Sequence, residues 1–448
     1  MSTGLLFLIV SIAILLLLIM VLKFKTNPFL ALLIVSIFTG LASGLPADEV
    51  LKSVQNGMGG ILGFVAIIVG VGAIFGQILE DSGGAKSMAK FLLKKFGQEK
   101  APWALVLTGF LISIPVFLDV GFIILVPIVY SLARNSKRSL LYYAIPLLAG
   151  LAVTHAFIPP TPGPVAVSEI IGADLGWVIL FGVITGVPTA IIAGPYFGKY
   201  IAKKINIEVP DLHFEEDENI SLPPFYLIGT LIGLPLILIL VSTTLGTLVN
   251  QEIITQNSFI DVMQFLGHPF VALILVTMLS LYVLGTRRGF SNDQLLKLSS
   301  KALGPAGLII LITGAGGVFK QILIDSGIGE AIADTVSDMN ISLLVLGYIL
   351  AVIIRVTQGS ATVAMITAAG MLSPILILTE VSEIQKALLV LSIAAGSTIL
   401  SHVNDSGFWL VGKYLGMTEK QTLKSWTVME TIISVVGFSI ILLLSLFF

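Results

Sequence analysis

The chain consists of long apolar runs separated by short polar connections. The runs are 17 to 24 residues long, and each can cross a hydrocarbon core of about 30 Å as an α-helix. We place ten membrane helices, at residues 4–22, 28–44, 57–79, 140–158, 177–198, 225–246, 262–284, 303–323, 387–410 and 427–447. The pattern predicts an all-α polytopic membrane protein.

Two further apolar segments, residues 103–133 and 343–378, are too long for one crossing and too short for two with a turn between them. Each has polar or helix-breaking residues at its middle. We therefore expect two re-entrant hairpins, which enter the membrane and return to the same side. The central residues are Pro115, Asp119 and Gly121 in the first hairpin, and Arg355, Gln358, Gly359 and Ser360 in the second.

One helix sequence occurs twice. Residues 60–83 and 304–327, shifted by 244 positions, match at 12 of 24 positions, where chance gives roughly two. Both copies are rich in glycine and both end in Asp-Ser-Gly. The chain therefore contains a duplicated unit, and each half has five predicted crossings and one hairpin.

The positive charges give the orientation. With both termini outside, 20 of the 24 Lys and Arg residues lie on the cytoplasmic side, as the positive-inside rule requires. Lys320 and Arg355 fall at membrane depth. The two copies of the duplicated helix then run in opposite directions. The sequence thus predicts two inverted repeats, residues 1–204 and 225–448, joined by an acidic cytoplasmic linker at 205–224.

The composition excludes a soluble globule. The chain is 56% hydrophobic and 11% charged, with a mean hydropathy of +1.04, whereas a soluble domain has about 25% charged residues. The first apolar run has no basic residue before it and no cleavage site after it, so we expect a retained helix. Cysteine is absent, which excludes disulfides. Because nucleotide, metalloprotease and hydrolase motifs are missing, we expect no enzyme activity, cofactor, metal or nucleic-acid partner.

Inverted repeats with broken helices are typical of secondary transporters, whose substrate sites lie where the interrupted helices end. Asp119 and Gly121 in the first hairpin put a carboxylate at membrane depth, where it either caps a helix or binds substrate or a proton. In the second hairpin, small and hydroxyl residues before a helix start suit an anionic ligand. Arg355 there either contacts substrate or pairs with a carboxylate such as Asp405 or Asp119.

A second pair of features follows the hairpins. Each half carries a hydroxyl residue followed by histidine, Thr154-His155 and Ser401-His402, and then a helix-breaking sequence. Two histidines at matching places beside backbone breaks are more often functional than a lone buried histidine. The glycines of the duplicated helix are explained best by close helix packing. Glu430, on the last helix, is an intramembrane carboxylate that these patterns do not explain.

These segments also resemble the gluconate permease (GntP) family of proton symporters. The resemblance runs over essentially the whole chain and includes the motifs FLDVGFIILVP, THAFIPPTPGP, RVTQGSATVAMITAAG, AAGSTILSHVNDSGFWLV and SWTVMETIIS. It implies the fold of the ion transporter superfamily, with paired hairpins and an elevator mechanism in a homodimer. Thr161 departs from the family, since many relatives have histidine there. This shifts the expected proton-coupling role to Asp119, His155, His402 and Asp405.

The resemblance implies import of gluconate or a related small hydroxy-acid anion with a proton, across a bacterial cytoplasmic membrane. A D-serine or glycerate permease of the same family and a sodium-coupled carboxylate transporter stay open as alternatives. The expected partners are the anion, the proton, membrane lipid and a second copy of the chain. The expected substrate-binding residues are Asp119, Gly121, Thr154, His155, Thr161, Arg355, Gly359, Ser360, Thr362, Ser401, Asn404 and Ser406.

Overall fold

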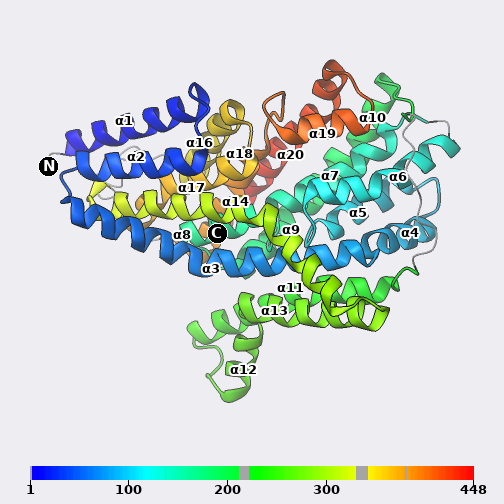
Figure 1. Ribbon diagram of the computed structural model, residues 1–448, viewed down its shortest axis with the longest axis horizontal. Helices are drawn as coiled ribbons and strands as arrows, with labels where there is room; N and C mark the ends of the chain where they lie inside the picture. Colours follow the sequence, from blue (N-terminus) through cyan, green and yellow to red (C-terminus); the bar gives the residue numbers. More distant parts are fainter. Residues whose placement is uncertain (1–2, 137, 211–220, 329–341, 379–380) are drawn as a thin grey trace.

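The computed structural model describes residues 3–136, 138–210, 221–328, 342–378 and 381–448, and this part of the chain is all-helical (Figure 1). Eight of its helices are long and apolar enough to cross a membrane. The α-helices are α1 Thr3–Leu22, α2 Pro28–Ala42, α3 Ala47–Asp81, α4 Gly84–Phe96, α5 Ala101–Ile112, α6 Leu118–Ser136, α7 Leu141–Phe157, α8 Pro162–Ile171, α9 Leu175–Ile191, α10 Phe197–Lys204, α11 Phe225–Asn250, α12 Ser258–Leu266, α13 Pro269–Ser280, α14 Asn292–Asp325, α16 Leu343–Gln358, α17 Ala361–Leu378, α18 Glu383–Thr398, α19 Ser406–Tyr414 and α20 Glu419–Leu444.

Both segments predicted as hairpins are broken where the polar and helix-breaking residues lie. The first is split into α5 and α6, and the second into α16 and α17. The arms of the second pack against each other, whereas α5 packs mainly against α4 and α7. The breaks are therefore confirmed, and re-entry to the same side stays a prediction. The predicted linker at 205–224 falls largely on residues 211–220, outside the described residues.

Two predicted continuous helices are wrong. The helix expected at 262–284 is interrupted at Gly267 and His268, because Pro269 starts α13 and disfavours helical backbone at the residue before it. The helix expected at 387–410 ends at Thr398, and α19 begins only at Ser406. Both breaks contain polar or helix-breaking residues, at 267–269 and at 401–405, but each lies within a longer apolar run that was assigned as one helix.

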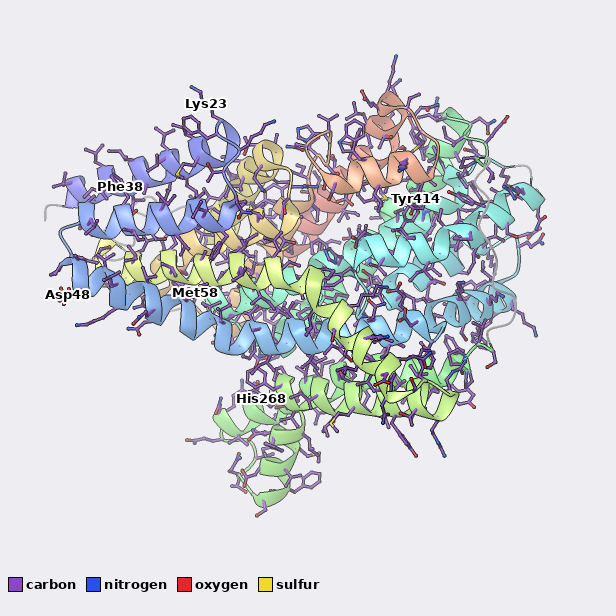
Figure 2. All side chains as sticks on the ribbon, in the orientation of Figure 1. Lys23, Phe38, Asp48, Met58, His268 and Tyr414 are labelled. Atoms are coloured by element: carbon purple, nitrogen blue, oxygen red, sulfur yellow. The ribbon has the colours of Figure 1, made fainter. Side chains whose placement is uncertain are left out.

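The two copies of the duplicated helix, α3 and α14, pack side by side and run antiparallel (Figure 1). Near the start of α3, Ser53 donates a hydrogen bond to the Asp325 carboxylate at the end of α14, 2.5 Å away. Further along, Met58 of α3 lies against Gly314 (Figure 2), and Gly70 approaches Leu303. Residues thus pair in opposite order, so the Asp-Ser-Gly ends of the two copies lie at opposite ends of the helix pair.

The helices form two groups. We call α2, α3, α13 and α14 the α3–α14 layer, since these helices pack mainly around that pair. The helices α5 to α9 and α16 to α20 form the broken-helix assembly. The groups meet where α14 packs on α17 and α3 packs on α8. Across this boundary, the Lys320 ammonium donates a hydrogen bond of 2.6 Å to the carbonyl of Ile170 at the end of α8.

Only some of the repeated glycines serve close packing. A Cβ on Gly316 would lie 2.7 Å from the side chain of Ile366, and one on Gly314 would lie 2.5 Å from the Met58 sulfur. By contrast, a Cβ on Gly60 or Gly63 would meet nothing within 4 Å. The packing explanation therefore holds for Gly314 and Gly316 but not for Gly60 and Gly63.

We predict that Gly57→Ala destabilises the protein and that Gly60→Ala does not. A Cβ on Gly57 would lie 2.5 Å from the Gly317 carbonyl oxygen, so α3 and α14 must separate, at an expected cost of about 1–3 kcal/mol. Gly60 is on the same helix and faces open space. The free energy of unfolding, measured by denaturant titration in detergent, checks this, and equal stability of the two variants would contradict it.

Candidate functional site

The residues singled out from the sequence lie in two clusters, one in each half of the chain. The first surrounds the break between α7 and α8, residues 158–161. A run of prolines ends α7, and α8 begins at Pro162, where a missing N–H costs nothing because the first helical turn has no acceptor for it. Since proline has no N–H, the sequence thus builds a sharp break with few backbone donors to satisfy.

Polar groups in the first cluster bind backbone carbonyls. Thr154 donates a 2.8 Å hydrogen bond to the Phe110 carbonyl, which ties α7 to α5. Thr161 donates a 2.7 Å bond to the Ile158 carbonyl within the break. Both hydroxyls are buried. They therefore hold the broken backbone in this conformation.

His155 is the titratable residue at the end of α7. Its ring packs edge-to-face on Phe117, with centroids 6.3 Å apart, and its Nδ1 is buried without a hydrogen-bond partner among the described residues. Asp119, in the first turn of α6, is exposed and close enough for its charge to act on His155. Gly121, two residues further on, is buried against Leu151. Asp119 and His155, both expected from the sequence to take part in proton coupling, therefore lie near each other.

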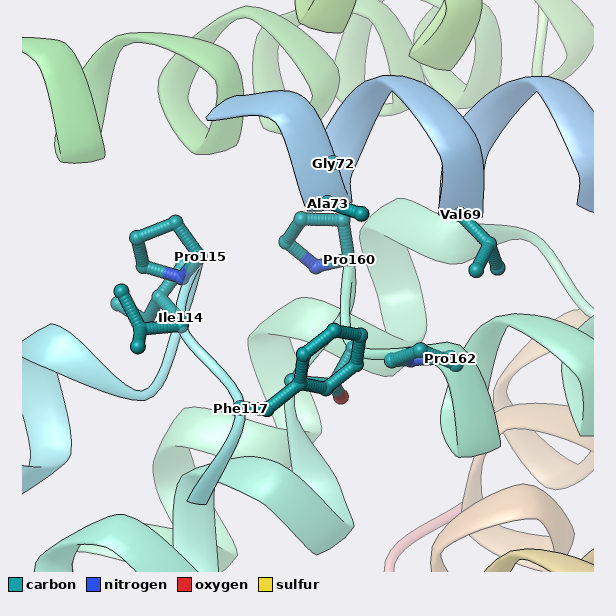
Figure 3. Close-up of a pocket in the computed structure, with 10 residues that line it drawn as sticks. Val69, Gly72, Ala73, Ile114, Pro115, Phe117, Pro160 and Pro162 are labelled. Carbon is teal, nitrogen blue, oxygen red and sulfur yellow. The ribbon is translucent and has the colours of Figure 1, made fainter. Parts of the chain in front are cut away.

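A narrow cavity of about 10 Å³ lies between these elements (Figure 3). Small-molecule sites typically have roughly 300–1,000 Å³, so this conformation is closed around the cavity. Three elements supply its lining: α3, the connection between α5 and α6, and the break before α8. The lining residues are Val69, Gly72, Ala73, Ile114, Pro115, Val116, Phe117, Pro160, Thr161 and Pro162.

The second cluster is organised by a buried ion pair. Arg355, in the last turn of α16, is 3% exposed, and its Nη2 lies 2.7 Å from the Asp405 carboxylate. Its Nη1 donates to the carbonyl of Gly359. Of the roles left open for Arg355, the structure thus shows the pairing with Asp405. This pair joins the second hairpin to the broken helix that follows it.

Gly359 is required at the end of α16 for two reasons. Its φ of 90° lies in the left-handed region, which L side chains rarely adopt. A Cβ there would also lie 2.3 Å from the Asn404 carbonyl oxygen. Asn404 in turn donates a 3.1 Å hydrogen bond to the Val356 carbonyl. The hairpin and the break before α19 are therefore in direct backbone contact.

Asp405 is also the N-cap of α19 and accepts a 3.1 Å bond from the Gly407 N–H. The Ser401 hydroxyl donates to the same carboxylate, and the Trp426 indole donates a 2.6 Å bond to Ser401. Thr427 donates to the Ser401 carbonyl. A single network thus connects α16, the break at 399–405 and α20.

The remaining candidates line the edge of this cluster. The Ser360 hydroxyl accepts a 3.4 Å bond from the Val363 N–H at the start of α17, and Thr362 is half-buried. Ser406 is exposed. His402 lies inside the break and not in a helix, unlike His155, so the two histidines do not have equivalent backbone positions. The Nδ1 of His402 is buried without a partner in the described part of the chain.

Sequence reasoning missed Trp426 and Thr427 and left Glu430 without a role. All three lie on one face of α20, because residues three and four apart on a helix are neighbours. Glu430 is buried, and the charges of Arg355 and Asp405 act on it. Their spacing of three and four residues in an apolar helix could have indicated from the sequence that these polar or amphipathic residues share one face.

Residues 5–447 match the model of the GntP family permeases. The chain belongs to the GntP permease family. It is therefore a membrane permease and not an enzyme. The permease is 43% identical over 434 residues to a gluconate permease of Pseudomonas aeruginosa, with 96% of this chain and 95% of the relative covered. It is 40% identical over 429 residues to the low-affinity gluconate transporter of Escherichia coli K12, with 95% of both chains covered.

The fold of the permease is similar to that of the YdaH transporter of Alcanivorax borkumensis. The two structures superpose with a TM-score of 0.64 at 15% sequence identity, over 92% of this chain and 97% of the other. At this identity the similarity concerns the fold alone.

We predict that Arg355 and Asp405 are strongly coupled in stability. Arg355→Met leaves a buried carboxylate unpaired and is expected to cost about 3–5 kcal/mol. Asp405→Asn removes the charge but keeps a good N-cap, so it isolates the ion pair. The double variant is expected to lose less than the sum of the single losses. Unfolding free energies of the four proteins in detergent check this, and additive losses would contradict it.

Proposed function

We propose that the permease imports gluconate or a related small hydroxy-acid anion by proton symport across a bacterial cytoplasmic membrane. The observation that carries the substrate class is the near full-length similarity to gluconate transporters. The Arg355 guanidinium, paired with Asp405, lies at a helix break and offers N–H donors of the kind that recognise carboxylates. Both termini are proposed to be extracytoplasmic.

The antiparallel packing of α3 and α14 supports two inverted repeats, residues 1–204 and 225–448. Copies of one helix that run in opposite directions, each followed by a broken segment, are the arrangement expected for a carrier with two mirror-related states. In this proposal the broken-helix assembly moves along the α3–α14 layer as an elevator, in each protomer of a homodimer.

The substrate is proposed to bind at the ends of the broken helices. The start of α17 presents backbone N–H groups after Gly359 and Ser360, and the positive end of a helix favours a carboxylate. Asn404 and Ser406 are exposed, and in this proposal they bind hydroxyl groups of a sugar acid, with the Asn404 amide nitrogen already held by the Val356 carbonyl. In the first half, Asp119, His155 and Thr161 are the corresponding groups.

A proton accounts for accumulation of an anion. Moving a monoanion into a negative interior costs about 2.3 kcal/mol per 100 mV, and a co-transported cation cancels that cost. The titratable residues Asp119, His155, His402 and Asp405 supply proton sites without metal ligands.

We predict that labelled gluconate accumulates in proteoliposomes when the outside is acidic and the inside neutral. Collapsing the proton gradient with an ionophore is expected to abolish accumulation, because no cation then offsets the charge. Sodium gradients at fixed pH form the second arm. Full uptake without a proton gradient, or uptake that follows sodium, would contradict proton symport. Glycerate and D-serine as competitors define the substrate range.

We predict that a cross-link between the two helix groups stops transport. The chain has no cysteine, so Gly316→Cys with Ile366→Cys places the only thiols between α14 and α17, at a contact across the boundary. Oxidation is expected to abolish exchange of labelled gluconate, and reduction to restore it. The control pair is Gly347→Cys with Ile393→Cys, between α16 and α18 inside the assembly. Undiminished transport by the oxidised first pair would overturn the elevator.

A further inference from the structure

We propose that Glu430 is the group that binds the coupled proton. In this proposal its carboxylate takes a proton from water to become a neutral carboxylic acid when the anion binds, and releases it when the anion leaves. The inference rests on the proposed proton symport and names the residue that performs it. It adds a site outside the residues that the sequence singled out.

The direction of the Glu430 side chain follows from its neighbours on α20. Trp426 and Thr427, one turn earlier, both bind Ser401 in the break before α19. One turn later, Ser434 shares a 2.9 Å hydrogen bond with the Tyr348 hydroxyl of α16. Glu430 lies between these contacts on the same helix face. Its carboxylate therefore points into the network of Arg355 and Asp405 and not toward lipid.

The charges in this network do not balance when Glu430 is ionised. Arg355 is already neutralised by Asp405, at 2.7 Å, and Glu430 is a second buried carboxylate beside the same guanidinium. A surplus charge at membrane depth costs several kcal/mol. A proton on Glu430 removes that charge and so lowers the energy of moving the assembly through the membrane.

Asp405 is less suited to this role. Its oxygens accept hydrogen bonds from Arg355, Ser401 and the Gly407 N–H. A protonated Asp405 would have to give up part of this network, because Arg355 and Ser401 both donate to the same carboxylate oxygen. Within the described residues, no hydrogen bond reaches the carboxylate of Glu430. It can therefore gain or lose a proton without breaking a contact that holds the fold.

Most of the elements that pack against α20 carry other ionisable groups. The helix packs against α7, α9, α18, α19 and the short π-helical turn at 192–196. The helix α9 carries no ionisable side chain. The groups are Tyr142, Tyr143 and His155 on α7, Tyr196 on the π-helical turn, Glu383 and Lys386 on α18, and Lys413 and Tyr414 on α19. In addition, α16 carries Tyr348 and Arg355, and the break at 399–405 carries His402 and Asp405.

Substrate and proton are coupled through Arg355. An anion bound beside this guanidinium adds negative charge to a network that already holds two carboxylates. The anion and the proton offset each other's charge, so each favours the binding of the other. Gluconate binding to the wild type is therefore expected to take up protons, and its affinity is expected to fall as the pH rises.

The test is calorimetry of gluconate binding to the purified full-length permease, in buffers of different ionisation enthalpy and across a range of pH. At a pH high enough for Glu430 to be ionised in the free protein, the wild type is expected to take up about one proton per gluconate. Glu430→Gln is expected to bind gluconate with no proton uptake and with a pH-independent affinity. In proteoliposomes it is expected to exchange gluconate but to lose accumulation driven by a proton gradient. Glu419→Gln, at the exposed start of α20, is the matched control and is expected to behave as wild type.

The outcomes separate this inference from the proposed function. A wild type that takes up no proton and ignores the proton gradient overturns proton symport itself. A proton-coupled wild type together with a Glu430→Gln variant of unchanged proton uptake overturns only the role of Glu430. If Glu430→Gln does not bind gluconate, Glu430→Asp decides: restored binding with proton uptake supports the inference. Binding without proton uptake, or loss of binding in both folded variants, contradicts it.

Discussion

The ion pair between Arg355 and Asp405 is the interaction on which the site depends. A guanidinium cannot lose its charge under physiological conditions, so at membrane depth it needs a partner. Asp405 supplies the charge and at the same time caps α19. The pair therefore fixes the end of the second hairpin against the break in the next helix. Without it, neither the close backbone contact at Gly359 nor the network through Ser401 to α20 would have a fixed geometry.

The α3–α14 layer gives this site its surroundings. Glycines where the helices touch let two antiparallel backbones approach closely, and the same helices contact α8 and α17 of the broken-helix assembly. Packing by small residues supplies contact without directional bonds. Lys320 of α14 donates one hydrogen bond across the boundary, to the Ile170 carbonyl at the end of α8. Such a boundary suits two groups of helices that have to change their relative position.

Much of this could be predicted from the sequence. Apolar length and charge asymmetry indicated the membrane helices, and the residues around Pro115 and Gly359 indicated the breaks. The sequence also named Asp405 as one possible partner of Arg355. It could not show that the helix at 387–410 ends as early as Thr398, because the helix-breaking residues come further along, after Ser401 and His402. Nor could it explain Glu430, since its role depends on neighbours from three separate segments that only the folded chain brings together.

The central claim is that a small acid binds where the broken helices end. The most direct measurement is a structure of the permease in a lipid nanodisc with gluconate bound. The account predicts density for the ligand beside the ends of the broken helices, with its carboxylate near Arg355 or the first turn of α17. Gluconate seated away from both breaks, with the residues around Gly359 and Thr161 unoccupied, would contradict the account.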